Sequence, residues 1–364
     1  MDLNNPIGIK SSEPNQSPFI MNPYRFAGGG AVGGWKELDR NILTVANSSI
    51  DITGLPNRQY YMVIRHTLGQ NTDITHNGGY QLNGDDEDHY AVRRGYIGNT
   101  TSEDTDFGDI DLWDTGNNNN FHVAYISNIS GEEKLFFAHN NNQNTGGSST
   151  APYSVNIVGK WADTTEPIDQ ITLKTLSSNT WNVGSEVIVL GYDESDTHTD
   201  TDNFWQELAS ADLSSGTDDD LSSGTFTAKK YLCVQTYLEQ DGGDIRGNVT
   251  FNDDPNATAG TLYSRSRSNN WATRSQAEDE SSVDVRGGSS QNWYSTMYIA
   301  NRSNKVKLIN GNIVLSATGN SNHVDHTLFG AKWDSTAQIT EINFHNTDGG
   351  SYGTNSIIKV WGHD

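Results

Sequence analysis

The sequence predicts an all-β protein: two tandem antiparallel β-sandwich (jelly-roll) domains preceded by an extended N-terminal arm. Short β-rich runs bounded by Gly, Asn, Asp and Ser dominate the chain. No stretch keeps apolar residues at helical spacing over three turns. The second half of the sequence repeats the first. A length of 364 residues suits two domains of about 150 residues each.

The composition limits the classes of partner. The chain carries 46 acidic and 23 basic side chains, which gives a net charge of −23. This charge repels nucleic-acid phosphates and anionic membrane surfaces, so neither partner is expected. Only 33% of the residues are hydrophobic, but the chain contains nine Trp, fifteen Tyr and eleven Phe. Disordered chains are poor in aromatic residues, so a folded protein is predicted.

The N-terminal segment reads as a polar arm followed by a flexible hinge. The arm, residues 1–26, contains several prolines and ends in the sequence Phe19-Ile20-Met21-Asn22-Pro23-Tyr24-Arg25-Phe26. Residues 27–34 are rich in Gly, which is typical of a flexible hinge. A phosphate-binding loop is not expected, because Trp35 separates the glycines from Lys36 and no Ser/Thr follows. No signal peptide is recognised, so synthesis in the cytoplasm is expected.

The strands of the first half follow from short runs rich in β-branched and aromatic residues. The predicted strands are Ile50–Thr53, Tyr60–Ile64, Phe121–Ile126, Ile171–Leu173 and Val187–Leu190. Polar and apolar residues alternate, so each sheet is expected to have one wet and one dry face. Each copy then closes two sheets against each other, with about eight strands in a jelly roll. The best short helix candidate is the range 203–211, with two turns at most.

The internal repeat is the strongest signal in the sequence, with seven matches in the same order. Trp35-Lys36-Glu37-Leu38 recurs 170 residues later as Trp205-Gln206-Glu207-Leu208, and Lys160-Trp161 recurs as Lys332-Trp333. The other matches pair Tyr60 with Tyr231, Leu82 with Phe251, Ile110 with Val283, Lys134 with Lys307, and Gly191 with Gly362. The offset drifts only between 169 and 173 residues, so the copies differ by small loop insertions.

The repeat sets the predicted domain boundaries. Residues 1–34 form the arm and hinge, 35–193 the first jelly roll, 194–204 an acidic linker, and 205–364 the second jelly roll. The acidic residues of the linker are interpreted as solvated spacing.

Cysteine and histidine give no sign of a metal or redox centre. The single cysteine, Cys233, excludes an intrachain disulfide and lies in an apolar run, so a buried inert thiol is expected. The ten histidines lack the spacing of a zinc site. No cofactor is therefore predicted. Acidic turns at equivalent places in the two copies leave Ca²⁺ as a weaker possibility, with Asp85, Asp86, Asp253 and Asp254 as ligands.

A carboxylate pair suggests one enzymatic alternative. Asp109 and Asp111 would share one face of a strand, as the acid and nucleophile of a sandwich glycosidase do. Asp is one methylene shorter than the Glu used for that chemistry. The second copy keeps the strand, as Val283-Asp284-Val285, but loses the pair. The sequence therefore favours a protein that is not an enzyme.

Four tryptophans are candidates for contact with a glycan or a partner, because aromatic rings stack on sugars and anchor interfaces. They are Trp113, Trp181, Trp271 and Trp293, of which half or more are interpreted as core or interface residues.

Each copy resembles the jelly-roll modules of tailed-phage virion proteins of the fibre, spike or head-decoration type. The resemblance rests on Trp35-Lys36-Glu37-Leu38, Ile52-Thr53-Gly54-Leu55-Pro56, Tyr60-Tyr61-Met62-Val63, Tyr90-Ala91-Val92-Arg93-Arg94, and Gly184-Ser185 with Val189-Leu190-Gly191. It covers most of residues 35–364. The second copy departs from it, because the Gly-Leu-Pro turn is missing and Asn355-Ser356 replaces Gly-Ser.

The resemblance implies a virion structural protein that forms a surface appendage or decoration, with exposed sandwiches and an anchoring arm. The arm residues that would contact the particle are Phe19, Ile20, Asn22, Pro23, Tyr24 and Phe26. Other virion proteins, a host surface glycan and further copies of the chain, most simply in a trimer, are the expected partners. Two alternatives stay open: a carbohydrate-binding receptor-recognition protein and a double jelly-roll capsid shell protein.

Overall fold

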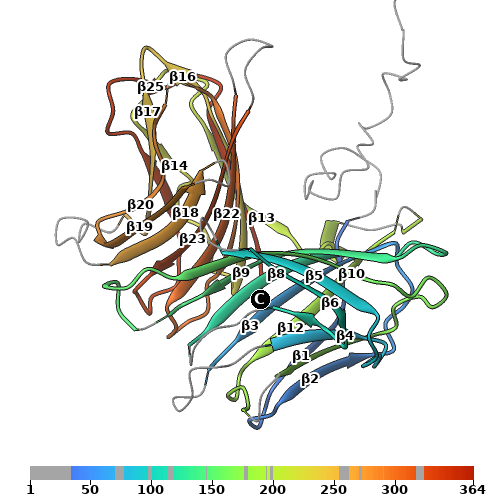
Figure 1. The fold of residues 1–364 in the computed structure, drawn as a ribbon. Coiled ribbons are helices and arrows are strands. Elements are labelled where there is room, and N and C mark those ends of the chain that lie inside the picture. The colour runs from blue at the N-terminus through green and yellow to red at the C-terminus, as the bar shows by residue number, and fades with distance from the viewer. Residues whose placement is uncertain are drawn as a thin grey trace, which may run out of the picture.

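A computed structural model of the chain forms two β-sandwiches that pack against each other (Figure 1). It describes residues 34–69, 78–96, 101–112, 118–144, 146–175, 179–193, 195–196, 200–253, 262–269, 273–289, 291–316 and 324–364. The first sandwich, blue to green, lies below the second, which is yellow to red. No strand of one sandwich pairs with a strand of the other among these residues.

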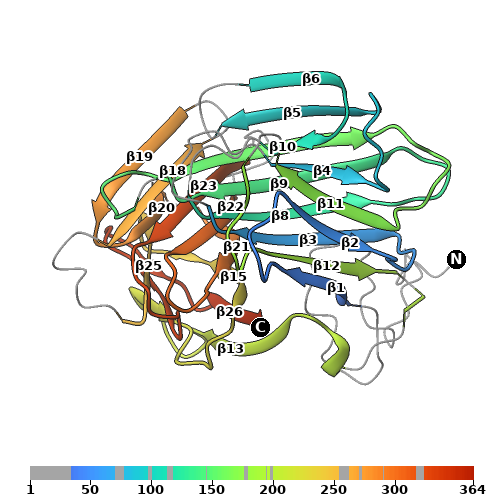
Figure 2. The ribbon, with the colours of Figure 1, turned by 90° about the horizontal axis from the view of Figure 1, so that it is seen from below.

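The first sandwich combines an eight-stranded and a four-stranded antiparallel sheet, and most of the large sheet is seen in order in Figure 2. The large sheet runs β1 (Lys36–Ile42), β12 (Glu186–Tyr192), β3 (Tyr60–Thr67), β8 (Asn120–Ser127), β9 (Lys134–Asn142), β10 (Tyr153–Trp161), β5 (Tyr90–Tyr96), β6 (Thr101–Phe107). The small sheet runs β2 (Ser49–Thr53), β11 (Gln170–Thr175), β4 (Gly78–Leu82), β7 (Ile110–Asp111).

The second sandwich repeats this plan. Its large sheet runs β13 (Gln206–Asp212), β26 (Ile357–His363), β15 (Tyr231–Leu238), β21 (Trp293–Ala300), β22 (Lys307–Leu315), β23 (Asp325–Trp333), β18 (Tyr263–Asn269), β19 (Thr273–Glu280). Its small sheet runs β14 (Asp220–Ser222), β24 (Ile342–His345), β17 (Ile245–Phe251), β20 (Val283–Ser289). A further pair joins β16 (Gln240–Asp241) and β25 (Ser351–Tyr352).

The strand order is that of a jelly roll with one sheet extended. The strands β1-β12-β3-β8 and β2-β11-β4-β7 form the four-plus-four arrangement of two Greek keys. The strands β9, β10, β5 and β6 then continue the first of these sheets. The expected number of about eight strands per copy was therefore too low, because each copy adds four strands to one edge.

The two copies agree at the places where the sequence repeats. The strands β9 and β22 each begin at a lysine, Lys134 and Lys307, respectively. The strands β10 and β23 each end at a tryptophan, Trp161 and Trp333, respectively. The turns after β4 and β17 each place an asparagine, Asn83 or Asn252, at positive φ. Asn tolerates this backbone conformation better than most residues, which explains why this turn residue is the same in both copies.

The expectation of one wet and one dry face is wrong for the middle of each large sheet. Along β3, Tyr61 and Val63 point into the first sandwich, while Met62 and Ile64 point outward. All four are nevertheless buried, because the outer faces of the two large sheets pack against each other. Cys233 on β15 belongs to this interface cluster, which confirms the buried thiol.

The described residues of the segment between the sandwiches include an ion pair and a short turn. A short 3₁₀ turn covers Asp200–Asp202, and β13 then occupies most of the range predicted as a helix, which corrects that prediction. The linker carboxylate of Asp196 forms an ion pair of 2.8 Å with Arg58. Among the described residues, no helix is long and apolar enough to cross a membrane.

Candidate binding groove at the domain interface

An apolar groove lies on the outer face of the first large sheet, beside the second sandwich. Leu135 and Phe137 project outward from β9, and Val158 projects from β10, where it pairs directly with Phe137. These side chains remain 58%, 50% and 51% exposed, respectively. Large apolar side chains that are exposed side by side on a folded domain commonly mark an interaction surface. We call this surface the groove.

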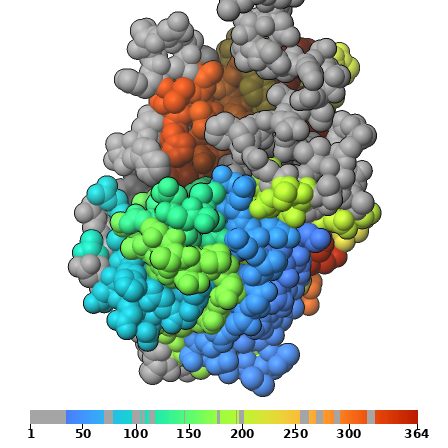
Figure 3. Space-filling model, turned by 90° about the vertical axis from the view of Figure 1, so that its right-hand side faces the viewer, coloured from blue at the N-terminus to red at the C-terminus, as the bar shows by residue number. Residues whose placement is uncertain are grey.

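The groove consists of three pockets that share Phe137. The first pocket, about 340 Å³, lies between Tyr60, Tyr125, Leu135 and Val158. The second, about 110 Å³, reaches the second sandwich at Thr296 and Tyr298. The third, about 370 Å³, is lined by Phe137, Val158 and residues of both copies. Figure 3 shows the first copy, blue to green, below the orange surface of the second.

A ladder of aromatic rings forms one wall of the groove. The Tyr125 ring stacks on Phe137, with centroids 4.8 Å apart and planes 19° apart. On its other side, Tyr125 contacts Trp35 at 6.1 Å. Its hydroxyl meets the hydroxyl of its repeat counterpart, Tyr298, at 2.5 Å. Burial raises the pKa of both tyrosines, so the pair stays neutral and joins the two copies through a hydrogen bond.

The third pocket ends among polar side chains. Asn156 and Arg93 come from the first copy, and Asn312 and His326 from the second. The His326 ring lies 2.6 Å from the Asn312 side-chain oxygen, and burial lowers the pKa of His326. Because the histidine is neutral at pH 7, the positive charge of this end comes from Arg93 and Arg94, which both line the pocket.

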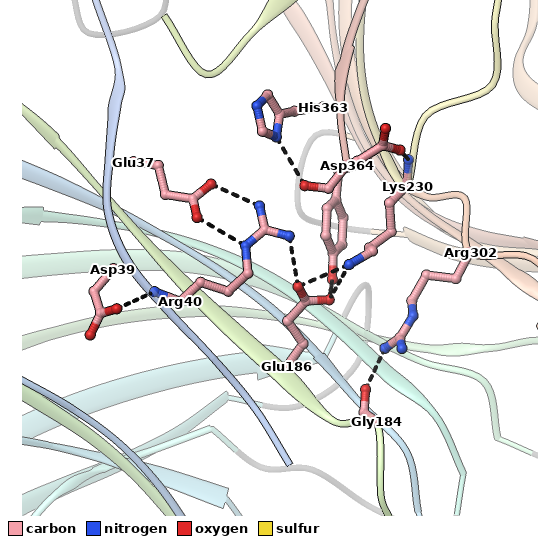
Figure 4. Close-up of polar contacts among 10 residues, drawn as sticks. Glu37, Asp39, Arg40, Gly184, Glu186, Lys230, Arg302, His363 and Asp364 are labelled. Atoms are coloured by element: carbon pink, nitrogen blue, oxygen red, sulfur yellow. Dashed lines mark hydrogen bonds and ion pairs between the residues drawn. The ribbon is translucent and has the colours of Figure 1, made fainter. Parts of the chain in front are cut away.

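A buried carboxylate links the two sandwiches (Figure 4). Glu186 on β12 is fully buried and accepts a hydrogen bond of 2.9 Å from Arg40 of the same copy. From the second copy, the Lys230 ammonium donates a hydrogen bond to Glu186 at 3.1 Å, and the Tyr231 hydroxyl donates another to Glu186 at 2.9 Å. Burial and the charge of Glu186 raise the pKa of Tyr231, which keeps its hydroxyl a donor. Breaking such a buried ion pair typically costs several kcal/mol.

Asparagine side chains form a second link between the sandwiches. The Asn141 amide on β9 donates to the backbone carbonyls of Ile309, at 2.9 Å, and Ala331, at 2.8 Å. In return, the Asn310 amide on β22 donates to the carbonyl of His139 at 3.0 Å. Backbone groups are fixed by the sheets, so these bonds hold the walls of the groove in one relative position.

The groove exists in one copy only among the described residues. The counterparts of Leu135, Phe137 and Val158 are Leu308, Asn310 and Gly330, by the offsets of the repeat. Leu308 is fully buried and Asn310 is 2% exposed, because the first sandwich covers them. The two large sheets are therefore offset from an exact two-fold arrangement, and the offset leaves one face open.

The tryptophans proposed from the sequence do not form this site. Trp181 is 1% exposed and belongs to the core of the first sandwich, so its prediction as a contact residue is wrong. Trp293 is equally buried, in the second core. Several other predicted site residues lie outside the described residues, namely Trp113, Trp271, Asp254, Phe19, Ile20, Asn22, Pro23, Tyr24 and Phe26.

The acidic turn after β4 has a structural partner for its first carboxylate. Asp85 accepts a hydrogen bond of 2.6 Å from the Trp161 indole, and the His89 ring lies 2.8 Å away. Although some burial opposes it, these hydrogen bonds lower the pKa of Asp85. Asp86 and Asp253 are exposed. In the described part of the chain, no three His, Cys, Asp or Glu residues come together as a metal site would require.

Of the two carboxylates in the enzymatic alternative, the structure describes the surroundings of Asp109. Asp109 precedes β7 and is only 6% exposed, with the Lys174 ammonium 3.9 Å away. Asp111 is the last residue of β7, which pairs with β4 of the small sheet. Asp109 is thus largely enclosed in the first sandwich.

No known protein family matches the chain, and no curated protein matches it. Among solved structures, the mouse laminin alpha1 chain, domains LG4-5, is similar at 9% sequence identity over 92% of both chains, with a TM-score of 0.16. A TM-score this low carries no argument about fold or function.

Proposed function

We propose that this chain is a non-catalytic structural protein of a virion surface, and that its groove holds an extended polypeptide segment. The carrying observation is the exposed apolar strip of Leu135, Phe137 and Val158 on a sheet face that is covered in the other copy. The virion assignment rests on the resemblance of the repeated jelly rolls to tailed-phage surface proteins. The groove adds a place where such a protein can hold a partner.

The chemistry of the groove favours a polypeptide. Apolar side chains form most of the first pocket, and burial of such surface against Leu, Ile or Phe stabilises a complex without any charge. A net charge of −23 opposes binding of phosphate-rich ligands. The amides of Asn156 and Asn312 at the other end can bond the backbone of an extended segment.

The large interface inside the chain affects the proposed oligomer. Apart from the groove, the outer faces that would pack on a symmetry mate are covered by the other copy of the repeat, at the interface to which Met62, Ile64 and Cys233 belong. A homo-trimer must therefore use the groove or surfaces outside the large sheets, and light scattering at micromolar concentration would detect it. A monomeric mass would remove the trimer from the proposal.

The groove is tested by competition for assembly. A double variant, Leu135→Ser with Phe137→Ser, is mixed with the unmodified chain, and incorporation of each into particles is measured. Each lost apolar side chain weakens binding by about 1.5–3 kcal/mol, so the variant should be under-represented at least about tenfold.

Val183→Ser is the matched control, because Val183 is 56% exposed and lies outside the groove. It should be incorporated like the unmodified chain. Equal incorporation of the double variant, with an unchanged circular dichroism spectrum, would contradict a role of the groove in assembly.

A carbohydrate-binding function is the second candidate, favoured by the third pocket. There the exposed Phe137 ring lies beside Arg93, Asn156 and Asn312, a ring and donors of the kind that stack on and bond to sugars. A glycan array in buffer containing Ca²⁺ tests it, with Phe137→Ser as the control. Hits that the variant loses would favour this function, and an array without hits would oppose it.

Copy number per particle would distinguish an appendage from a double jelly-roll shell protein.

A further inference from the structure

We infer that the occupant of the groove is the chain's own arm, through the apolar block of residues 19–26. This inference rests on the proposed function and names the polypeptide that the groove holds. It is carried by the place where the chain enters the first sandwich, by the length of the hinge, and by the chemistry of the block and the groove.

The chain enters the described structure at the wall of the groove. Gly34 and Trp35 are buried, and β1 begins at the next residue. The ring centroids of Trp35 and Tyr125 are 6.1 Å apart, and those of Tyr125 and Phe137 are 4.8 Å apart. The point at which the arm and hinge join the first sandwich thus lies within two ring contacts of Phe137, at the centre of the groove.

The hinge has the length that this placement requires. Residues 27–34 join the apolar block to Trp35. Eight residues span at most about 26–29 Å when extended. By composition, a Gly-rich chain of this length has an average end-to-end distance of about 16 Å. A segment of this length can therefore reach Phe137, which all three pockets share, and a tether this short would hold the block at an effective concentration in the millimolar range.

The block and the groove are chemically complementary. Residues 19–26 contain the apolar side chains Phe19, Ile20, Met21, Tyr24 and Phe26. They contain no carboxylate and one cation, Arg25, on a chain of net charge −23. Asn22-Pro23 divides the apolar residues into two groups, and proline favours an extended backbone around it. Two apolar groups on an extended segment match an apolar groove made of several pockets around Phe137.

The tether favours the arm of the same chain over the arm of a second copy. At micromolar protein concentration, a second copy offers its arm at a concentration about a thousandfold below the effective concentration of the tethered one. We therefore commit to intramolecular occupancy, in which the arm covers the groove of its own chain and any other segment must displace it.

Disulfide trapping in the full chain tests the inference. Tyr24→Cys is combined with Leu135→Cys, and the pair is oxidised under mild conditions. Cys233 does not interfere, because it is buried and burial raises its pKa to about 12. We expect an intrachain disulfide that forms at least tenfold faster than in the control, Tyr24→Cys with Val183→Cys. A disulfide-linked dimer would overturn intramolecular occupancy, and equal rates in the two variants would overturn the occupant altogether.

Titration of a synthetic peptide of residues 17–28 into a chain lacking residues 1–26 separates this inference from the proposed function. The peptide should bind the truncated chain, and Phe137→Ser should weaken it at least tenfold. If the peptide does not bind but the groove variants still fail to assemble, the arm is excluded as the occupant while the groove keeps its function. If neither effect is seen, both proposals fail.

Discussion

His66 and His122 lie on opposite faces of the first large sheet, and both are fully buried. His122 points into the sandwich, where the Tyr80 hydroxyl lies 3.4 Å from its Nδ1. Burial, together with the positive charge of Arg65, lowers the pKa of His122 well below its ordinary value. His66 faces the second sandwich, and burial lowers its pKa in the same way, helped by Arg302. Both rings are therefore neutral in the folded protein at neutral pH.

These two histidines make folding sensitive to mild acid. The unfolded chain binds a proton at each histidine below its ordinary pKa of about 6.5, whereas the folded chain does not. Stability is therefore complete above pH 6.5 and falls as the pH drops below it, by up to about 1.4 kcal/mol per pH unit for each histidine. Urea unfolding between pH 7.5 and 5 should show this slope, and His122→Asn should flatten it. An equal slope in the variant would show that His122 titrates normally in the folded state.

At the scale of the strands, the two copies fill the same end of their sandwiches differently. In the first copy, Asn120, Asn140 and Asn142 are buried, and the Asn142 amide donates to the Asn120 side chain at 2.7 Å. Their counterparts in the second copy are Trp293, Ile313 and Leu315, which are equally buried. One end is thus held by hydrogen bonds and the other by apolar packing. The backbone of β17 lies close enough to the Trp293 ring that only glycine fits at Gly247.

Gly247→Ala should therefore destabilise the second sandwich. A Cβ at this position would lie 2.3 Å from the Trp293 ring, so the ring or the strand must move. Overpacking of this kind costs about 1–3 kcal/mol, measurable as a shift of the urea midpoint. Gly95→Ala is the control, because a Cβ at Gly95 on β5 would meet nothing within 4 Å. A Gly247→Ala variant as stable as this control would mean that Trp293 repacks without cost.

The strands show what the sequence could predict and what it could not. Runs such as Tyr60–Ile64 predicted strands of the first copy, and the repeat extended these predictions to the second copy. The continuous apolar run of β3 also indicated burial on both faces, a signal that the expectation of alternating faces overlooked. The groove was not predictable, because Phe137 and Val158 are 21 residues apart and meet only through the pairing of β9 with β10. Trp181 was misplaced because sequence gives no measure of which aromatic residues enter a core.

At the scale of the whole molecule, the interface makes the two sandwiches one unit. It combines an apolar cluster from both large sheets, the buried Glu186 network and the Asn141 bonds. Gly330 on β23 lies close to the other copy in this interface, because an added Cβ would be 2.6 Å from the Cβ of Ser154. The Cys233 thiol is enclosed in the same interface, with its pKa raised to about 12 by burial.

Gly330→Ala should loosen this interface and make the thiol of Cys233 accessible. In the unmodified chain, burial raises the pKa of the thiol and keeps it protonated at pH 7, and only the thiolate reacts, so labelling should be very slow. The variant should label at least tenfold faster, with a thermal midpoint about 2–6 °C lower for a loss of 1–3 kcal/mol. Gly95→Ala is again the control. Unchanged labelling would contradict the close contact at Gly330.

The offset of the two large sheets also sets the valency of the molecule. A symmetric pair of identical sandwiches would present two equivalent open strips or none. Here one strip is covered at Leu308 and the other is open at Leu135, so each chain offers one groove in its described part. The number of grooves on any assembly therefore equals its number of chains, and avidity for a repeated partner can come only from assembly of several chains.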